Sequence, residues 1–121
     1  MRRTGGLVLI VDDNDDVREV LAFMVSTAGY RVETAADGCE ALDKLREFHP
    51  CVVVLDLMMP KMDGQTFRRA QLADETVRDI PVVCYSAAPD LRRTAEELGV
   101  SYVEKTGEIG ELLQEIRRRC S

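Results

Sequence analysis

Residues 51–56 read CVVVLD, a run of five apolar residues that ends in an aspartate. A strand that is apolar on both of its faces is typical of the centre of a parallel sheet, where helices cover the two sides. A strand with one face in water would instead alternate apolar and polar residues. We therefore expect a buried central strand over 51–56, with the Asp56 carboxylate at its carboxyl end.

Short apolar runs alternate with amphipathic stretches along the rest of the chain. The other runs that predict strands are 7–11 (LVLIV), 30–35 (YRVETA), 80–87 (IPVVCYSA) and 100–105 (VSYVEK). Each run is followed by a stretch with helical periodicity, and the connections are short. Five β–α units of this kind predict an α/β domain with a doubly wound parallel sheet and right-handed crossovers. The helix that follows strand 80–87 is expected to be short.

Two of these amphipathic stretches predict which side chains face the core. The first has apolar residues at helical spacing, namely Val17, Val20, Leu21, Met24, Val25 and Ala28. The second has Ala41, Leu42, Leu45 and Phe48, and we expect it to end at His49-Pro50 because proline disfavours a helical residue before it. Both stripes are expected to pack against the sheet.

The composition indicates one acidic globular domain. A chain of 121 residues with a formal net charge of −6 can bury a core, and it is a poor partner for nucleic acid. The longest apolar runs, five to seven residues, are too short to insert in a membrane. We expect a cytoplasmic protein whose residues 1–121 form one domain, without a linker or an output domain.

The four cysteines have no metal-binding spacing. Cys39, Cys51, Cys84 and Cys120 are scattered, and the single histidine, His49, gives a zinc site little support. Cys84 lies inside an apolar run and is expected to be a small buried side chain. We expect free thiols in a reducing compartment, although the sequence leaves a disulfide open.

Polar residues follow four of the five predicted strands. Asp12 and Asp13 come after the first, Asp56 after the third, Ser86 near the end of the fourth and Lys105 at the end of the fifth. The carboxyl ends of parallel strands share one edge of a sheet, where such folds bind ligands. Carboxylates suit Mg²⁺, and a lysine serves as a compact positive charge for a phosphate or a carboxylate. The sequence thus predicts a site at this edge.

Four segments in order along the chain, VLIVDDNDDVR (8–18), VVVLDLMMPKMDG (52–64), VVCYSA (82–87) and YVEK (102–105), carry a family resemblance. With them the chain resembles the receiver domain of the two-component response regulators. The resemblance implies a flavodoxin-like fold with strand order 2-1-3-4-5. It also implies a phosphoacceptor switch rather than an enzyme, and a phosphodonor that is a sensor histidine kinase or a phosphotransfer protein.

The resemblance also implies a magnesium-bound phosphoacceptor. By this likeness Asp56 is the carboxylate that takes the phosphoryl group. Asp13 and Asp56 bind Mg²⁺ directly together with the backbone carbonyl of Met58, while Asp12 reaches the metal through water. The metal offsets the repulsion among the carboxylates and stabilises charge on the transferring phosphoryl oxygens.

The other matched residues imply a conformational switch that a downstream protein partner reads. Lys105 contacts one phosphoryl oxygen, Ser86 hydrogen-bonds another, and the Tyr102 ring turns inward when the Ser86 loop moves. The family usually has a cis proline after this lysine, but here Thr106 follows. A cis bond to a non-proline residue costs about 2.5–4 kcal/mol. The loop either keeps a cis bond at that cost or, as we expect, runs trans with Gly107 making the turn.

Simpler interpretations of the acidic stretch remain. Asp15 and Asp16 are expected only to charge the first turn of a helix capped by Asn14 or Asp15. Asp12 and Asp13 could do the same, but the matched Asp56 and Lys105 argue against it. A calcium loop of the EF-hand type fails, because it needs a glycine and a glutamate at positions where this chain has other residues.

Two other classes of function stay open. An aspartyl-phosphate phosphohydrolase would typically place its nucleophile in a DxD motif after the first strand, and this chain has an adjacent pair there. A pseudo-receiver that only binds other proteins would usually lack one of Asp13, Asp56 or Lys105, and all three are present.

Overall fold

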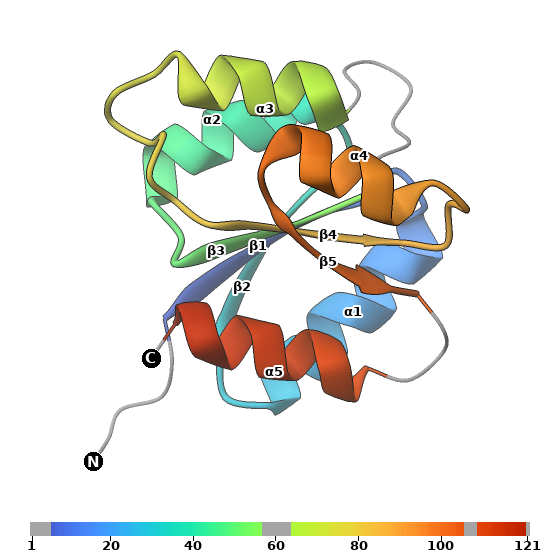
Figure 1. The fold of residues 1–121 in the computed structure, drawn as a ribbon. Helices are drawn as coiled ribbons and strands as arrows, with labels where there is room; N and C mark the ends of the chain where they lie inside the picture. Colours follow the sequence, from blue (N-terminus) through green and yellow to red (C-terminus); the bar gives the residue numbers. More distant parts are fainter. Residues whose placement is uncertain (1–5, 57–63, 106–108, 121) are drawn as a thin grey trace.

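A five-stranded parallel sheet with helices on both faces forms the domain in the computed structural model, which describes residues 6–56, 64–105 and 109–120 (Figure 1). The strand order is β2-β1-β3-β4-β5, and every neighbouring pair is parallel. The strands are β1 (Leu7–Val11), β2 (Arg31–Ala35), β3 (Val52–Leu55), β4 (Val82–Ser86) and β5 (Ser101–Glu104). The helices are α1 (Asp15–Thr27), α2 (Gly38–Phe48), α3 (Gly64–Leu72), α4 (Leu91–Leu98) and α5 (Gly110–Arg119). The predicted fold class and strand order are confirmed.

Both faces of the central strands are buried, as the CVVVLD run predicts. All four residues of β3 are at most 2% exposed. Alternate side chains of β1 enter two separate apolar clusters. Leu9 and Val11 join the cluster beneath α2 and α3, whereas Val8 and Ile10 join the one beneath α1 and α5. The two helical layers therefore enclose the sheet between two cores.

Two predicted core stripes are wrong in part. In the first stripe Val20 is 56% exposed and Met24 37%, although Leu21 and Val25 are buried. In the second stripe Phe48 is 39% exposed. The periodicity identified the correct side of α1, but the arc of apolar residues is wider than the strip of helix that the sheet covers. As a result an apolar band on the flank of α1 faces the solvent.

Local signals in the sequence account for the ends of several helices. The Asn14 side chain caps α1 by accepting a hydrogen bond from the Val17 backbone N–H at 2.9 Å. Residue His49 ends α2 in the left-handed conformation, with φ of 47°, directly before Pro50. The helix α4 is short, with eight residues, and Gly99 ends it with φ of 70°. The predicted cap, helix end and short helix are all confirmed.

The cysteines divide into a bonded pair and two free thiols. Cys51 and Cys120 form a disulfide, with their Cα atoms 5.2 Å apart, so the expectation of free thiols is wrong for this pair. The sequence does not show that the start of β3 and the end of α5 adjoin, because the two cysteines are 69 positions apart. Cys39 and Cys84 are free, and Cys84 is fully buried as expected.

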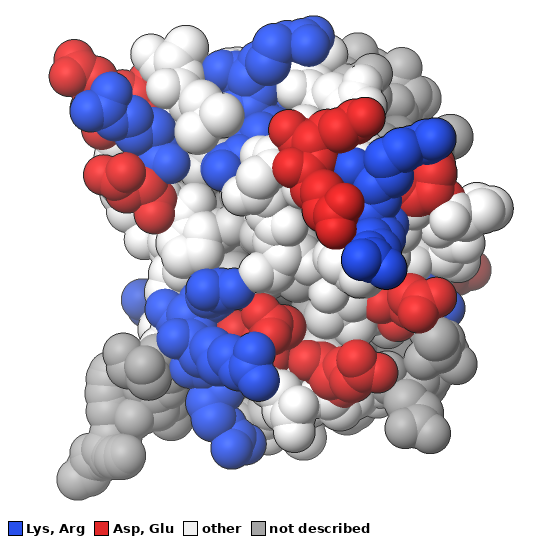
Figure 2. All heavy atoms as spheres, in the orientation of Figure 1, with Lys and Arg blue, Asp and Glu red and all other residues white. Residues whose placement is uncertain are grey.

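Charged side chains of both signs are interspersed on the face that carries α4 and α5 (Figure 2). Basic side chains gather at the carboxyl end of α5, whose last turn contains three consecutive arginines, residues 117–119. There they interact favourably with the negative end of the helix dipole. Among the described residues, no helix has the length and apolar character needed to cross a membrane.

Candidate functional site

Three carboxylates meet at the carboxyl edge of the sheet. Asp12 and Asp13 directly follow β1, and Asp56 directly follows β3, its neighbour in the sheet. The Asp56 backbone N–H donates to the Val11 carbonyl at 3.0 Å, so the strand pairing extends as far as Asp56 itself. Asp12, Asp13 and Asp56 each offer one carboxylate oxygen, and these oxygens all lie within 4.8 Å of one another. The topology thus brings together the acids that the sequence predicts as a site.

The buried member of this cluster is Asp12, which is 3% exposed. Its Oδ2 lies 3.0 Å from Lys105 Nζ, and its Oδ1 accepts a hydrogen bond from the Asn14 backbone N–H at 2.9 Å. Burying a carboxylate is costly unless it is paired and hydrogen-bonded, and both oxygens of Asp12 are satisfied in this way. The Lys105 ammonium is thus the counter-ion of a carboxylate that is buried at the edge of the sheet.

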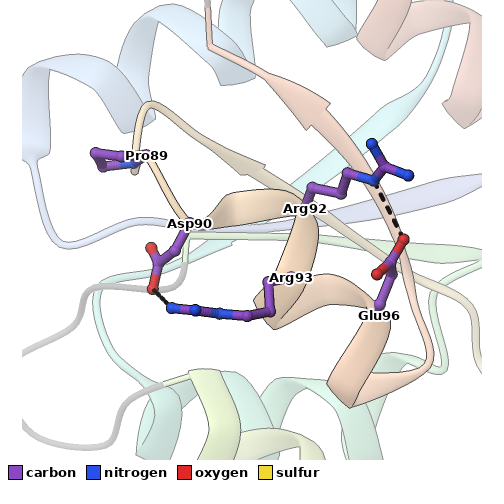
Figure 3. A pocket seen from close by; sticks show the side chains of 5 residues that line it. All are labelled: Pro89, Asp90, Arg92, Arg93 and Glu96. Atoms are coloured by element: carbon purple, nitrogen blue, oxygen red, sulfur yellow. Dashed lines mark hydrogen bonds and ion pairs between the residues drawn. The ribbon is translucent and has the colours of Figure 1, made fainter.

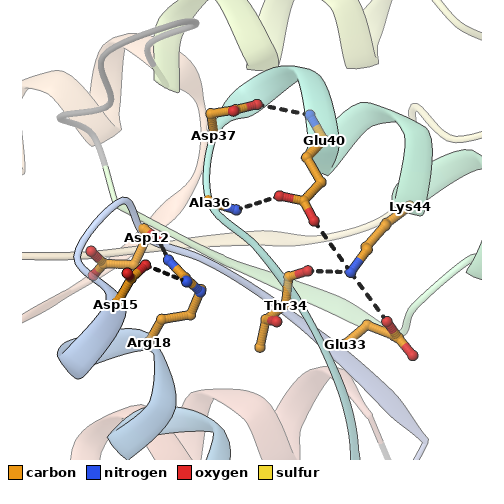
Figure 4. A network of polar contacts seen from close by, with 9 residues as sticks. All are labelled: Asp12, Asp15, Arg18, Glu33, Thr34, Ala36, Asp37, Glu40 and Lys44. Atoms are coloured by element: carbon orange, nitrogen blue, oxygen red, sulfur yellow. Dashed lines mark hydrogen bonds and ion pairs between the residues drawn. The ribbon is translucent and has the colours of Figure 1, made fainter.

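Arg18 braces the loop that carries these acids. Its guanidinium donates to the Asp12 carbonyl at 2.8 Å and to the Asp15 carboxylate at 2.5 Å (Figure 4). We did not predict this role from the sequence, although Arg18 is the last residue of the segment VLIVDDNDDVR. Its spacing from Asp15 is i+3, a distance at which side chains meet on a helix.

A second group of polar contacts links β2 to α2 (Figure 4). Lys44 Nζ donates to the Thr34 carbonyl at 2.5 Å and also lies within ion-pair distance of Glu33 and Glu40. The Glu40 carboxylate in turn accepts a hydrogen bond from the Ala36 backbone N–H at 2.8 Å. Lys44 is thus paired within its own network.

Exposure increases across the carboxylate cluster. Asp12 is buried, Asp56 is half-buried and Asp13 is exposed. One side of the cluster is thus open to solvent, and the other rests on Lys105. A cation approaching from solvent would meet Asp13 and Asp56 first.

Lys105 is fixed between β4 and the carboxylates. Its backbone N–H donates to the Ser86 carbonyl at 3.0 Å, and its Nζ lies 5.4 Å from the centroid of the Tyr85 ring. Burial raises the pKa of the Tyr85 hydroxyl, and the nearby Lys105 ammonium opposes that shift. The strand pairing and the aromatic ring together hold the ammonium over the edge of the sheet.

Ser86 lies in β4 and Tyr102 in β5, and their side chains have different surroundings. Ser86 is 4% exposed, and its Oγ accepts a hydrogen bond from the Ala88 backbone N–H at 3.1 Å. Tyr102 is 39% exposed on β5, opposite Cys84 in the register. Of the two predicted switch residues, therefore, Ser86 is built into the edge and Tyr102 lies on the outside.

Cys84 lies beneath this edge in β4. Burial raises the pKa of its thiol to about 12, with Arg68 opposing the shift and the negative charge of Asp56 adding to it. The thiol is therefore protonated at neutral pH.

Met58 and the Lys105–Thr106 bond, on which two further predictions rest, involve positions outside the described residues.

A hollow beside the start of α4 lies close to the Ser86 loop in the chain, and Figure 3 shows its lining. Its charges are paired along the helix. Arg92 and Glu96 lie 3.3 Å apart, and Arg93 and Asp90 lie 3.7 Å apart. These exposed pairs contribute little to stability, and they leave the carboxylate cluster as the stronger candidate site.

Comparisons with known proteins agree with this geometry. Residues 8–117 match the family model of the response regulator receiver domain. A probable transcriptional regulator, ycf27 of Cyanophora paradoxa, is 43% identical over 113 residues, which are 91% of this chain and 46% of that protein. The response regulator MprA of Mycobacterium sp. (strain KMS) is 39% identical, over 91% of this chain and 48% of that protein. The chain thus spans about half the length of these curated relatives.

Solved structures share the fold over nearly the whole chain. The chemotaxis protein CheY4 of Vibrio cholerae has a TM-score of 0.84 and 30% identity, covering 94% of this chain and 98% of that one. The receiver domain of the sensor histidine kinase PA1611 of Pseudomonas aeruginosa has a TM-score of 0.85 and 28% identity, covering 95% and 97%. With a matching family model over residues 8–117, the chain belongs to the response regulator receiver domain family.

Proposed function

We propose that this domain is a phosphoacceptor switch in the cytoplasm. In this proposal Asp56 receives a phosphoryl group from a phosphohistidine of a sensor histidine kinase or a phosphotransfer protein. The modified domain then presents a changed surface to a downstream protein partner, without direct contact with nucleic acid. The observation that carries the proposal is the convergence of three carboxylate oxygens within 4.8 Å, with the Lys105 ammonium 3.0 Å from one of them.

The donor set fits a magnesium ion. Mg²⁺ prefers oxygen ligands and keeps several waters, so two carboxylates on an open edge suit it. We assign direct contacts to Asp13, Asp56 and the Met58 carbonyl, and a contact through water to Asp12. When bound, the ion offsets the repulsion among the acids and stabilises negative charge on phosphoryl oxygens. The solved PA1611 receiver domain, similar in fold, is described with magnesium coordinated in its active-site cleft.

Four residues of the chain then have separate roles in the phosphoryl transfer. A carboxylate oxygen of Asp56 attacks the phosphorus as the bond from phosphorus to the histidine nitrogen breaks. Lys105 supplies positive charge beside the phosphoryl oxygens. The Ser86 hydroxyl donates to one of these oxygens, which draws its loop inward. Tyr102 then turns from its exposed position, and this changes the surface at β5.

An apolar groove between α1 and α5 is the surface that we assign to the phosphodonor protein. It is lined by Phe23, Met24, Thr27, Ala28, Ile109 and Leu113, and Phe23 is 72% exposed. Exposed apolar surfaces of this kind mark protein contacts. The groove reaches the carboxyl edge of the sheet at Ile109, directly before α5, and extends along the second half of α1 away from that edge. Because one end of the groove lies at the sheet edge that carries Asp56, we assign it to the donor protein.

The central experiment is phosphorylation by a small donor. The protein is incubated with acetyl phosphate and Mg²⁺, and intact mass spectrometry counts the phosphoryl groups. One group per chain is expected, with none in Asp56→Asn or without Mg²⁺. Asp16→Asn is the matched control, because it removes a nearby exposed acid that we place outside the site. Absence of modification in the wild type would favour a pseudo-receiver, and continued release of phosphate from a specific ester would favour a phosphohydrolase.

The docking surface has its own test. Phe23→Ser should slow phosphorylation by a phosphohistidine protein at least tenfold and leave phosphorylation by acetyl phosphate unchanged. Leu72→Ser, which changes an exposed apolar residue on α3 outside the groove, is the control. Equal rates for Phe23→Ser and wild type with the protein donor would remove the groove from the proposal without affecting the role of Asp56.

A further inference from the structure

We propose that Cys51 and Cys120 are a reversible redox pair, whose disulfide locks the end of α5 to the amino end of β3. Cys51 directly precedes β3, and Cys120 ends α5, where its backbone N–H donates to the Ile116 carbonyl at 2.9 Å. Their Cα atoms lie 5.2 Å apart, inside the usual range of about 4.4–6.8 Å for disulfides. The backbone already places the two sulfurs together.

The pair lies at the sheet edge opposite the candidate phosphoacceptor. Cys51 and Asp56 stand at the two ends of β3, about 16 Å apart along an extended strand. Figure 1 shows the carboxyl end of α5 beside the amino ends of the central strands. A change at the cysteines therefore acts through α5, without contact with the carboxylate cluster.

The surroundings accommodate both oxidation states. The two cysteines are half-buried and pack against the apolar cluster beneath α1 and α5, so the reduced side chains remain well placed. Cys51 Sγ lies 3.3 Å from the Leu7 carbonyl oxygen, an acceptor for its S–H when the pair is reduced. A Cβ at Gly6 would lie 3.3 Å from the same sulfur, so the lack of a side chain there leaves it room.

Reversibility rests on the proposed cytoplasmic function. In that compartment thiols are kept reduced, and disulfides are mostly transient or sense oxidation. Because neither cysteine is fully buried, exchange partners can reach the sulfurs.

The chemistry is thiol–disulfide exchange with a small disulfide such as oxidised glutathione. One cysteine thiolate attacks that disulfide, forms a mixed disulfide and releases the first small thiolate. The second cysteine thiolate attacks the bound protein sulfur and releases the other small thiolate. The two protons lost by the cysteines end on the two released thiols, and two electrons pass from the protein to the small disulfide. A dithiol reductant reverses both steps.

Closing the pair should stabilise the domain, mainly by restricting the unfolded chain. The bond joins residues 69 positions apart, and a loop of this size is expected to lower the unfolding equilibrium constant by a factor on the order of 10²–10³. The effect should be largest at the last turn of α5, which is otherwise held by contacts such as Arg119 to Ser101 and Glu115. Its amide protons should exchange faster after reduction.

The test uses the unphosphorylated chain without Mg²⁺, so it is independent of the phosphoacceptor proposal. After equilibration with oxidised glutathione and unfolding, two thiols should react, and four after reduction. Mass spectrometry of a digest should find the peptides of Cys51 and Cys120 joined. The oxidised wild type should unfold at a higher urea concentration, and dithiothreitol should abolish this difference.

The variants separate the bond from other effects. Cys120→Ser should unfold as the reduced wild type does, with or without dithiothreitol, whereas Cys39→Ser should keep the full redox dependence. Four reactive thiols after oxidation would overturn the proposal. So would a urea midpoint of the wild type that does not respond to dithiothreitol, a comparison that needs no variant.

Discussion

The Lys105 ammonium lies 3.0 Å from the buried Asp12 Oδ2, although the two residues are 93 positions apart in the chain. The contact joins the ends of β5 and β1, which are separated in the sheet by β3 and β4. It gives the carboxylate cluster an internal counter-ion. Lys105 therefore serves the unmodified domain by neutralising Asp12, in addition to its proposed role with the phosphoryl group.

Replacing Lys105 should uncouple metal binding from phosphorylation. In Lys105→Met the buried Asp12 carboxylate loses its partner, so we expect the domain to lose about 2 kcal/mol of stability without metal. Mg²⁺ should bind up to about tenfold more tightly, because the repelling ammonium is gone. Phosphorylation by acetyl phosphate should nevertheless slow at least tenfold. Calorimetric titration with Mg²⁺, urea unfolding and mass spectrometry measure the three effects.

Lys44→Met is the matched control for this variant. The Lys44 side chain is 26% exposed and that of Lys105 25%, and both changes remove one positive charge. An equal gain of Mg²⁺ affinity in both variants would show that net charge, and not the contact with Asp12, sets the affinity.

Ser86 should be needed for the movement of Tyr102. In Ser86→Ala the Ala88 N–H loses its acceptor, which should cost about 1 kcal/mol in urea unfolding. Nuclear magnetic resonance of the Tyr102 ring should show a shift with beryllofluoride and Mg²⁺ in the wild type and a much smaller one in Ser86→Ala. Ser86→Thr keeps the hydroxyl and should keep the shift. An unchanged Tyr102 shift in Ser86→Ala would show that Ser86 is not needed for the movement of Tyr102.

The Asn14 cap should support the loop without taking part in the chemistry. Asn14→Ala removes the acceptor of the Val17 N–H and should lower the free energy of unfolding by about 1 kcal/mol. Asn14→Ser should retain most of that stability, as measured by urea unfolding. Saturating Mg²⁺ should restore phosphorylation of Asn14→Ala to the wild-type level. A persistent loss would mean that the cap also positions Asp13 or Asp56.

The sequence was sufficient to predict the sheet and the acids at its edge. Unbroken apolar runs such as CVVVLD mark central strands, and parallel topology forces the residues after Val11 and Leu55 to one edge. The sequence was not sufficient to predict the partner of Lys105. Strand order places this lysine at the edge, but it does not determine which carboxylate the long side chain reaches.

Long-range packing explains the other differences. The exposure of Val20 and Met24 depends on how much of α1 its neighbours cover, which periodicity does not contain. The pairing of Cys51 with Cys120 depends on where the last turn of α5 meets the sheet, and the two residues are 69 positions apart in the chain. Both features depend on how the helices pack on the sheet, and neither follows from a local pattern in the sequence.

The buried Cys84 thiol should give the folded domain a distinct response to alkaline pH. Its pKa rises from an ordinary value of 9.0 to about 12, chiefly because burial penalises the thiolate. An unfolded chain would release this proton near pH 9, so the contribution to stability is full below that pH. It is lost progressively as the pH rises toward 12. Cys84→Ala should show a smaller loss of stability over this window in urea unfolding.

Alkylation gives an independent measurement of the same property. At pH 8 iodoacetamide should modify Cys84 in the folded domain roughly 10³-fold more slowly than the exposed Cys39, since the thiolate is the reactive form. In urea the two rates should become similar, and Cys39→Ser should remove only the fast phase. Rapid labelling of Cys84 in the folded protein would contradict the burial of this thiol beneath Asp56. Its slow labelling would confirm that β4 stays buried beneath Asp56 in the folded domain.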